Sequence, residues 1–291
     1  MSKHGMIVDM KEISVKKIED AIASMCRDIA VTASPDIVSA FEKAANAETN
    51  EKSKAVLDIL IDNARIAKEE NIPICQDTGM AIVWIKAGQE VHFTDGLVNE
   101  AVNRGVERGY TENYLRASVV DDPLYERKNT KTNTPAVIYT ELTEGDRVEI
   151  EIMAKGFGSE NKSALKMLTP ADGEEGVIEF VKDTLLKAGP NACPPFVIGV
   201  GIGGTFDSCA VLSKKALLRK LDEHNPDARY AALEEKLLTM ANELKIGPMG
   251  FHGRTTALAI KVENEPTHIA GMPVAVNVCC HVCRHAKAVI E

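Results

Sequence analysis

Seven cysteines, several of them beside histidines, are the residues of this chain whose types and spacing most directly suggest chemistry. They are Cys26, Cys75, Cys193, Cys209, Cys279, Cys280 and Cys283. Cys280 and Cys283 have C-x-x-C spacing, and His281 and His285 lie close by, so this run could hold zinc tetrahedrally or form a redox dithiol. Because unpaired cysteine is among the most buried residue types, burial in the core is an equally good interpretation of the same run.

A glycine-rich stretch, Gly199-Val-Gly201-Ile-Gly-Gly204, matches the G-x-G-x-x-G pattern of dinucleotide-binding folds. That pattern requires a following strand with an acidic residue about 20 residues further on. Here the chain continues through Leu221–Pro226 into another predicted helix instead. The pattern therefore favours a tight strand-to-helix turn near a site over a dinucleotide-dependent oxidoreductase.

Two shorter motifs carry weaker signals. Asp77-Thr78-Gly79 is the tripeptide of aspartic proteases, but those enzymes need two such carboxylates and this chain has one copy. In Lys155–Asn161, two glycines follow a predicted strand, and Ser159 is placed to cap the next helix. Such a helix start can bind a carboxylate, although an ordinary strand–helix turn has the same spacing.

Composition limits the class of protein. The chain has 291 residues, 45% of them hydrophobic and 26% charged, which is typical of a globular protein. Its net charge of −9 argues against nucleic acid or a membrane surface as a partner. No run is apolar enough to span a membrane, and Met1–Asp20 has no apolar core typical of a signal peptide. With an odd number of cysteines, this predicts a cytoplasmic protein with reduced thiols.

The helices and strands predicted to position these residues indicate an α/β fold. Apolar spacing predicts a mainly helical segment over residues 1–70 and a mixed α/β part over 71–291. Within the second part, strands are expected at Met80–Ala87, Ala136–Thr140, Val148–Met153, Phe196–Gly201, Ala257–Val262 and Pro273–Val278. Helices are expected at Leu97–Gly109, Ile178–Leu186, Phe206–Leu221 and Tyr230–Leu244. We expect one domain over 1–291, with mixed β-sheets surrounded by helices and a helical layer at the N-terminus.

Several stretches, taken together and in order, resemble one family. They are Ile74–Gly79, Arg116–Ser118, Asn133–Ala136, Lys155–Asn161, Cys193–Pro195, Ile202–Thr205, Ile246–Gly250 and Pro273–Cys280. This combination resembles the alpha subunit, or N-terminal domain, of the class I iron–sulfur hydro-lyases, which include class I fumarate hydratases and L(+)-tartrate dehydratases. The resemblance covers the chain from about residue 15 to its end.

The resemblance implies a [4Fe–4S] cluster on three separated cysteines, which match Cys75, Cys193 and Cys280. Cys280 is preferred to Cys279 because its neighbours align best. A cluster with three thiolates keeps one iron open, and that iron can act as a Lewis acid toward a hydroxyl group. The other four cysteines are then expected to be structural.

The resemblance also implies the residues that bind and convert the substrate. Gln76, Asp77, Arg116, Gly158 and His268 are the expected substrate-binding residues, with Asp77 and His268 as candidates for proton transfer. Arg116 could bind a carboxylate through two parallel hydrogen bonds. Without the resemblance, a surface ion pair for Arg116 and a satisfied loop position for His268 would be the simpler interpretations.

The implied reaction is the reversible dehydration of (S)-malate to fumarate, with L(+)-tartrate dehydration as the close alternative. Single-chain members of the family continue into a second domain with further substrate-binding residues, whereas this chain stops at Glu291. We therefore expect a separately encoded beta subunit, and a homodimer of this chain within a hetero-oligomer.

Overall fold

A computed structural model describes residues 10–291 of the chain. The first nine residues of Met1–Asp20, the segment predicted to lack a signal peptide, lie outside the described part. The chain divides into two compact units, each assembled from segments distant in sequence. Unit 1 comprises Met1–Ala30, Cys75–Lys155 and Arg284–Glu291, and unit 2 comprises Val31–Ile74 and Gly156–Cys283. The prediction of one domain over 1–291 stays a prediction.

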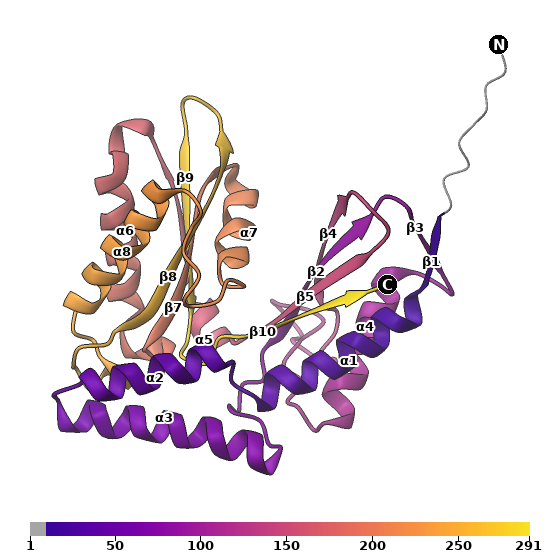
Figure 1. Ribbon diagram of the computed structural model, residues 1–291, viewed down its shortest axis with the longest axis horizontal. Coiled ribbons are helices and arrows are strands. Elements are labelled where there is room, and N and C mark those ends of the chain that lie inside the picture. The colour runs from indigo at the N-terminus through magenta and orange to yellow at the C-terminus, as the bar shows by residue number, and fades with distance from the viewer. Residues whose placement is uncertain (1–9) are drawn as a thin grey trace. The chain divides into compact units, whose positions relative to one another are not determined.

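Unit 1 is built on a four-stranded mixed sheet in the order β10-β5-β2-β4 (Figure 1). Its elements are β1 (Lys11–Ser14), α1 (Val15–Val31), β2 (Met80–Gly88), β3 (Val91–Thr94), α4 (Val98–Glu112), β4 (Val137–Thr143), β5 (Val148–Lys155) and β10 (Arg284–Ile290). Strand β2 is parallel to β4 and antiparallel to β5, and β10 is antiparallel to β5. The C-terminal strand therefore returns the chain to the unit in which it began.

Two glycines let helices α1 and α4 approach closely in unit 1. A Cβ at Gly105 would come within 2.7 Å of the Glu19 carbonyl oxygen, and one at Gly109 within 2.7 Å of the Cys26 Cβ. Because the two glycines are four residues apart, they lie on the same face of α4. Any larger residue there would push the two helices apart.

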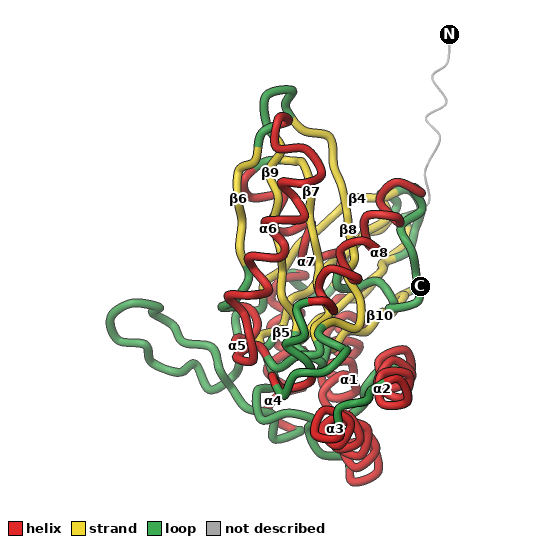
Figure 2. Tube along the Cα trace, turned by 90° about the vertical axis from the view of Figure 1, so that its left-hand side faces the viewer, coloured by secondary structure: helices red, strands yellow, loops and turns green. Residues whose placement is uncertain are grey.

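Unit 2 is a four-stranded sheet in the order β6-β9-β7-β8 with helices on both faces, and Figure 2 shows these strands side by side. Its elements are α2 (Pro35–Ala47), α3 (Glu51–Glu70), α5 (Phe157–Glu160), β6 (Ala164–Leu168), α6 (Gly173–Ala188), β7 (Phe196–Gly204), α7 (Phe206–Ala216), α8 (Ala228–Glu243), β8 (Ala257–Thr267) and β9 (Met272–Cys279). Figure 1 shows α6 and α8 on one face of the sheet and α7 on the other.

The glycine-rich stretch lies inside strand β7, not at a turn as expected. Ile198, Val200 and Ile202 point into the apolar core shared with α6 and α8. Because side chains alternate along a strand, Gly199 and Gly201 face α7. A Cβ there would meet the carbonyl oxygens of Ser213 and Cys209 at 1.9 and 2.4 Å. Gly199 and Gly201 therefore serve close helix–strand packing, whereas Gly203 and Gly204 end the strand with φ values of 95° and 68°.

The elements agree with the sequence where apolar periodicity is long. The mixed α/β class, the N-terminal helices and the six predicted strands are confirmed. The helix after β7 ends at Ala216 instead of Leu221, because hydrogen bonds to the third residue back tighten the chain from Leu217 onward. Four strands, β1, β3, β6 and β10, were not expected. No helix within residues 10–291 combines the length and apolar character needed to cross a bilayer.

Candidate active site

In unit 1, the loop Cys75–Gly79 leads into β2, and three side chains from distant segments hold its carbonyl groups. Tyr110 Oη lies 2.9 Å from the Thr78 oxygen and 3.0 Å from the Gly79 oxygen. Asn133 Nδ2 donates to the Gly79 oxygen at 3.0 Å. Arg284 Nη2 donates to the Asp77 oxygen at 2.8 Å. All three side chains are buried, so the loop backbone is fixed from beneath.

Gly79 is required where this loop enters the strand. Its φ is 81°, in the left-handed region that side-chain-bearing residues avoid. A Cβ there would also lie 2.8 Å from the carbonyl carbon of Ala154 on the neighbouring strand. The tripeptide Asp77-Thr78-Gly79 is therefore explained by a tight loop–strand junction, and Asp77 Oδ1 closes it by accepting from the Gly79 N–H at 2.9 Å.

The same loop lies beside the segment that carries Arg116. Thr78 Oγ1 donates to the Arg116 carbonyl oxygen at 3.0 Å. Gln76 and Arg116 are exposed and Asp77 is half-buried. The Arg116 guanidinium makes no ion pair within residues 10–291, so the simpler interpretation of this arginine as a surface ion-pair partner has no support there. The backbone of unit 1 thus places the segment of Gln76 and Asp77 beside that of Arg116, and Gln76 and Arg116 are accessible.

In unit 2, Cys193 and Cys280 lie at the same end of the sheet. Cys193 lies three residues before the start of β7, and Cys280 directly follows β9. The two strands are antiparallel, with Val197 opposite Cys279. The His281 backbone N–H donates to the Cys193 carbonyl oxygen at 3.2 Å. The fold therefore makes neighbours of two cysteines that are far apart in the sequence.

Gly158 belongs to the same end of unit 2. It is exposed in the short helix α5, and a Cβ added to it would lie 4.0 Å from the Asn191 carbonyl oxygen. Asn191 is two residues before Cys193. The expected cap by Ser159 is wrong, because α5 begins at Phe157 and the Ser159 hydroxyl donates to the Gly156 carbonyl oxygen at 3.1 Å instead. The turn is also tied to its surroundings, because Glu160 pairs with Lys214 of α7 and accepts from Asn277 Nδ2 of β9 at 3.2 Å.

His268 lies at the opposite end of unit 2. It is exposed in the turn between β8 and β9, where its Nδ1 accepts from the Ala270 N–H at 3.2 Å. Strand β9 has eight residues, so at about 3.3 Å per residue His268 and Cys280 are separated by roughly 25 Å. Figure 1 shows the β8–β9 turn at the end of the sheet away from α5. Within one chain, the fold therefore does not bring His268 close to Cys193 and Cys280.

Solvent exposure separates the seven cysteines into two groups. Cys193 is exposed and Cys75 and Cys280 are half-buried, whereas the other four are buried. Burial raises the pKa of the Cys26 thiol to about 12 and that of the Cys209 thiol to about 11, so both resist forming the thiolate that binds metal. The three accessible thiols are the three that the sequence predicts as cluster ligands. The donor set therefore fits an iron–sulfur cluster.

The C-terminal Cys/His run is used for packing and backbone contacts. Cys283 Sγ donates to the Leu217 carbonyl oxygen at 3.7 Å, and His281 Nδ1 lies 3.1 Å from the Cys193 carbonyl oxygen. Within residues 10–291, no three His, Cys, Asp or Glu side chains are grouped as ligands of a single metal ion. Cys283 and His281 thus each contact a backbone carbonyl group.

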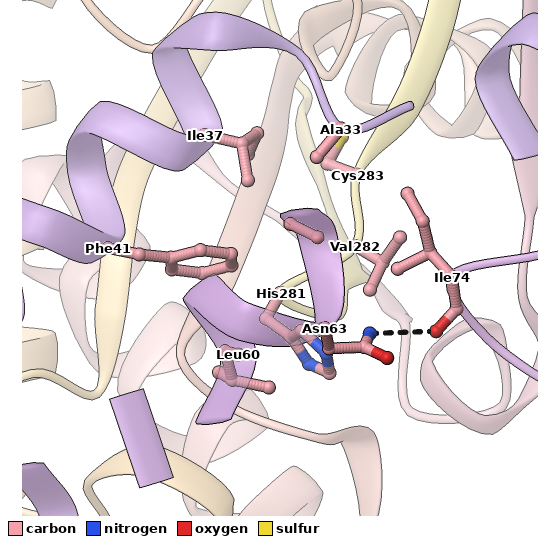
Figure 3. A pocket seen from close by; sticks show the side chains of 10 residues that line it. Ala33, Ile37, Phe41, Leu60, Asn63, Ile74, His281, Val282 and Cys283 are labelled. Atoms are coloured by element: carbon pink, nitrogen blue, oxygen red, sulfur yellow. Dashed lines mark hydrogen bonds between the residues drawn. The ribbon is translucent and has the colours of Figure 1, made fainter. Parts of the chain in front are cut away.

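A small apolar pocket of about 10 Å³, the lower limit for one water molecule, is lined by the residues that follow Cys280 (Figure 3). Phe41, Leu60 and His281 line it, and Asn63 donates to the Ile74 carbonyl oxygen beside it at 2.9 Å. Val282 packs with Ile74 and Cys280 in an adjoining apolar cluster. One side of Cys280 is thereby shielded from water.

Sequence reasoning missed the residues that hold the two cysteine segments. Tyr110, Asn133, Arg284 and His281 act through backbone carbonyl groups of residues far away in the chain. Arg284 gave no clear signal, because it opens a C-terminal strand that also contains the polar His285 and Lys287. Tyr110 and Asn133 gave none, because a tyrosine on an amphipathic helix and an asparagine in a loop are ordinary.

Comparison with known proteins places the whole chain in one group. The model of the family described as "Fumarate hydratase (Fumerase)" matches residues 19–289. A protein of Methanocaldococcus jannaschii named "Putative L(+)-tartrate dehydratase subunit alpha" is 43% identical over 276 residues, covering 93% of this chain and 96% of that protein. The L(+)-tartrate dehydratase subunit alpha of Escherichia coli K12 is 30% identical over 283 residues, covering 97% and 93%.

Proposed function

This chain belongs to the fumarate hydratase family and is a hydro-lyase, and from that premise we propose that it is the alpha subunit of an enzyme that reversibly dehydrates a four-carbon 2-hydroxydicarboxylate. The observation that carries the proposal is the division of the cysteines by exposure. The three thiols accessible to a cofactor are Cys75, Cys193 and Cys280, and the remaining four are buried. These three are the proposed ligands of a [4Fe–4S] cluster.

The first proposed reaction is the interconversion of (S)-malate and fumarate. Dehydration of L(+)-tartrate is the second candidate, and the names of the relatives favour it. The two substrates differ by one hydroxyl group, so the same carboxylate-binding residues serve both. Assays of the assembled enzyme with malate, fumarate and both tartrate enantiomers decide between them, and turnover of tartrate alone would contradict the first candidate.

The cluster, when bound, supplies an iron with an open coordination position that acts as a Lewis acid toward the substrate hydroxyl. The chain's own residues do the binding and positioning. We assign the exposed Arg116 guanidinium to one substrate carboxylate through two parallel hydrogen bonds, and the neighbouring Gln76 amide to orient it. Holding the reactant in one geometry is the main contribution of such groups.

Asp77 is the proposed proton-transfer group of unit 1. Its Oδ1 accepts from the Gly79 N–H and its main-chain oxygen accepts from Arg284 Nη2, so the carboxylate is held in a fixed orientation. A base held this way needs no reorganisation when it takes a proton. In unit 2, the exposed Gly158 leaves room for a ligand to approach the backbone of α5 beside Asn191.

His268 requires a second copy of the chain if it takes part in proton transfer. Strand β9 separates it from Cys280 by its full length, so its own chain cannot deliver it. The β8–β9 turn that carries His268 is open to another molecule, since Ile269 is 90% exposed. The proposed homodimer then has a function, which is to complete each site with a histidine from the partner.

A separately encoded beta subunit is the remaining part of the proposal. The relatives are named as alpha subunits, and this chain spans 96% and 93% of the two compared above. A dianionic substrate needs a cationic or hydrogen-bonding partner for each carboxylate. Reconstituting the cluster in this chain alone and assaying it tests the point. We expect negligible turnover that returns on adding the partner, and full turnover without it would refute the split-subunit proposal.

A further inference from the structure

The residue that follows Cys280 makes two contacts with one atom of Cys193. The His281 backbone N–H donates to the Cys193 carbonyl oxygen at 3.2 Å, and His281 Nδ1 lies 3.1 Å from the same oxygen. A carbonyl oxygen can only accept, so Nδ1 must carry a proton and donate. One carbonyl of the Cys193 segment is thus held twice by the residue adjacent to Cys280.

Cys193 needs such restraint because of its backbone conformation. Its φ is 53°, in the left-handed region that is unfavourable for a residue with a side chain. The Cys193 N–H donates to the Pro190 carbonyl oxygen at 3.1 Å, and the Pro194 carbonyl oxygen accepts from the Met249 N–H at 2.8 Å. The contacts from His281 secure the one carbonyl that lies between these two anchors.

The surroundings of the imidazole keep it in place. His281 is 9% exposed and lines the small apolar pocket together with Ile37, Phe41 and Leu60 (Figure 3). The centroids of the Phe41 and His281 rings are 6.2 Å apart at an interplanar angle of 49°. Little water can compete for the Nδ1 hydrogen bond in such a pocket, because an apolar site with room for barely one molecule offers it few partners.

We propose that His281 is a positioning residue that fixes Cys193 and Cys280 relative to each other, so that their thiolates are preset for the iron–sulfur cluster. We call the two contacts from His281 to the Cys193 carbonyl oxygen the clamp. The inference rests on the proposed function for the identity of the cluster, but the clamp is a property of the protein alone. It assigns to His281 a role distinct from metal ligation. Groups that orient metal ligands typically change metal retention by 10- to 100-fold when they are removed.

Two substitutions separate the hydrogen bond from the packing of the ring. His281→Asn places an amide N–H close to where Nδ1–H stood, and His281→Phe keeps an aromatic ring against Phe41 but has no donor. Phe41→Leu is the matched control, since it alters the same pocket and leaves both contacts with Cys193. Each variant is reconstituted anaerobically with iron and sulfide, and iron release to a chelator is timed. Thermal melting of the cluster-free chains shows whether any variant is misfolded.

We expect wild type, His281→Asn and Phe41→Leu to retain iron similarly, and His281→Phe to release it at least about tenfold faster with an unchanged melting temperature. Equal retention by His281→Phe, or failure of His281→Asn to rescue, would overturn the clamp. Amide hydrogen exchange in the peptide that contains Cys193, measured on the cluster-free chains, tests the clamp without the cofactor, and we expect faster exchange in His281→Phe only. If the wild-type chain takes up no iron but exchange is still faster only in His281→Phe, the proposed function is wrong and the clamp is supported.

Discussion

Asn133→Ala should destabilise unit 1 by about 3 kcal/mol. Asn133 is fully buried, and its Nδ2 donates to the Gly79 oxygen at 3.0 Å while its Oδ1 accepts from the Ser118 N–H at 2.8 Å. Losing these two hydrogen bonds costs about 1 kcal/mol each. The residue also has a φ of 57°, which asparagine tolerates and which costs alanine about 1 kcal/mol more.

Urea unfolding followed by tryptophan fluorescence measures this change in the free energy of unfolding in unit 1. The single tryptophan, Trp84, is buried in β2 of unit 1 and stacks on Tyr139 with ring centroids 5.5 Å apart. Asn103→Ala is the matched control. Asn103 also makes two side-chain hydrogen bonds, to Asn99 and Ala136, but it lies in helix α4. Alanine recovers about 0.6 kcal/mol of helix propensity there, so we expect a net loss of about 1 kcal/mol.

The reasoning fails if Asn133→Ala costs no more than Asn103→Ala. That result would mean that the Cys75–Gly79 loop is held by other contacts and that Asn133 only fills space. A loss of about 3 kcal/mol against about 1 kcal/mol in the control identifies Asn133 as a link between the Cys75–Gly79 loop and the Arg116–Ser118 segment, in addition to the hydrogen bond from Thr78 to Arg116.

Three further predictions follow from the exposure and placement of single residues. In the cluster-free chain at pH 8, a thiol-specific reagent should modify the exposed Cys193 first and the buried Cys26 and Cys209 last, as peptide mass spectrometry would show. Burial raises the pKa of Cys26 from 9.0 to about 12, so between these pH values the folded chain keeps a proton that the unfolded chain loses. The free energy of unfolding relative to Cys26→Ala should therefore be constant below pH 9 and fall by up to about 4 kcal/mol as the pH rises toward 12. In the enzyme assembled with the proposed beta subunit, mixing inactive His268→Asn chains with inactive Cys280→Ser chains should restore part of the activity through mixed dimers, and no recovery would contradict supply of His268 by a second copy.

The strands and helices with long apolar patterns could be predicted from the sequence, because burial of one face imposes a regular period. Strands β1, β3 and β6 could not, since four or five residues at a sheet edge or in a two-stranded sheet leave no such period. Strand β10 has seven residues, but Arg284, His285 and Lys287 interrupt its apolar pattern. The glycines of β7 show a second limit. Their motif is compatible with a phosphate-binding turn and with close helix–strand packing. The approach of α7 to Gly199 and Gly201 in the structure shows that they serve packing.

The candidate site divides in the same way. Residues at the surface of the loops, such as Asp77 and Arg116, were identified because the resemblance assigns them roles directly. Asn133 and His281 act on carbonyl oxygens contributed by distant segments, and backbone groups leave no trace in the residue types. His268 shows the opposite problem, since its spacing from Cys280 in the sequence matches the family while a full-length strand separates the two residues in space.

The iron and sulfide content of the anaerobically reconstituted chain tests the central claim most directly. The wild-type chain should bind about four irons and four sulfides. Cys75→Ser, Cys193→Ser and Cys280→Ser should each lose the cluster, whereas Cys26→Ser and Cys209→Ser should retain it. Retention of four irons by Cys193→Ser, or binding of stoichiometric zinc in place of iron by the wild-type chain, would contradict the account.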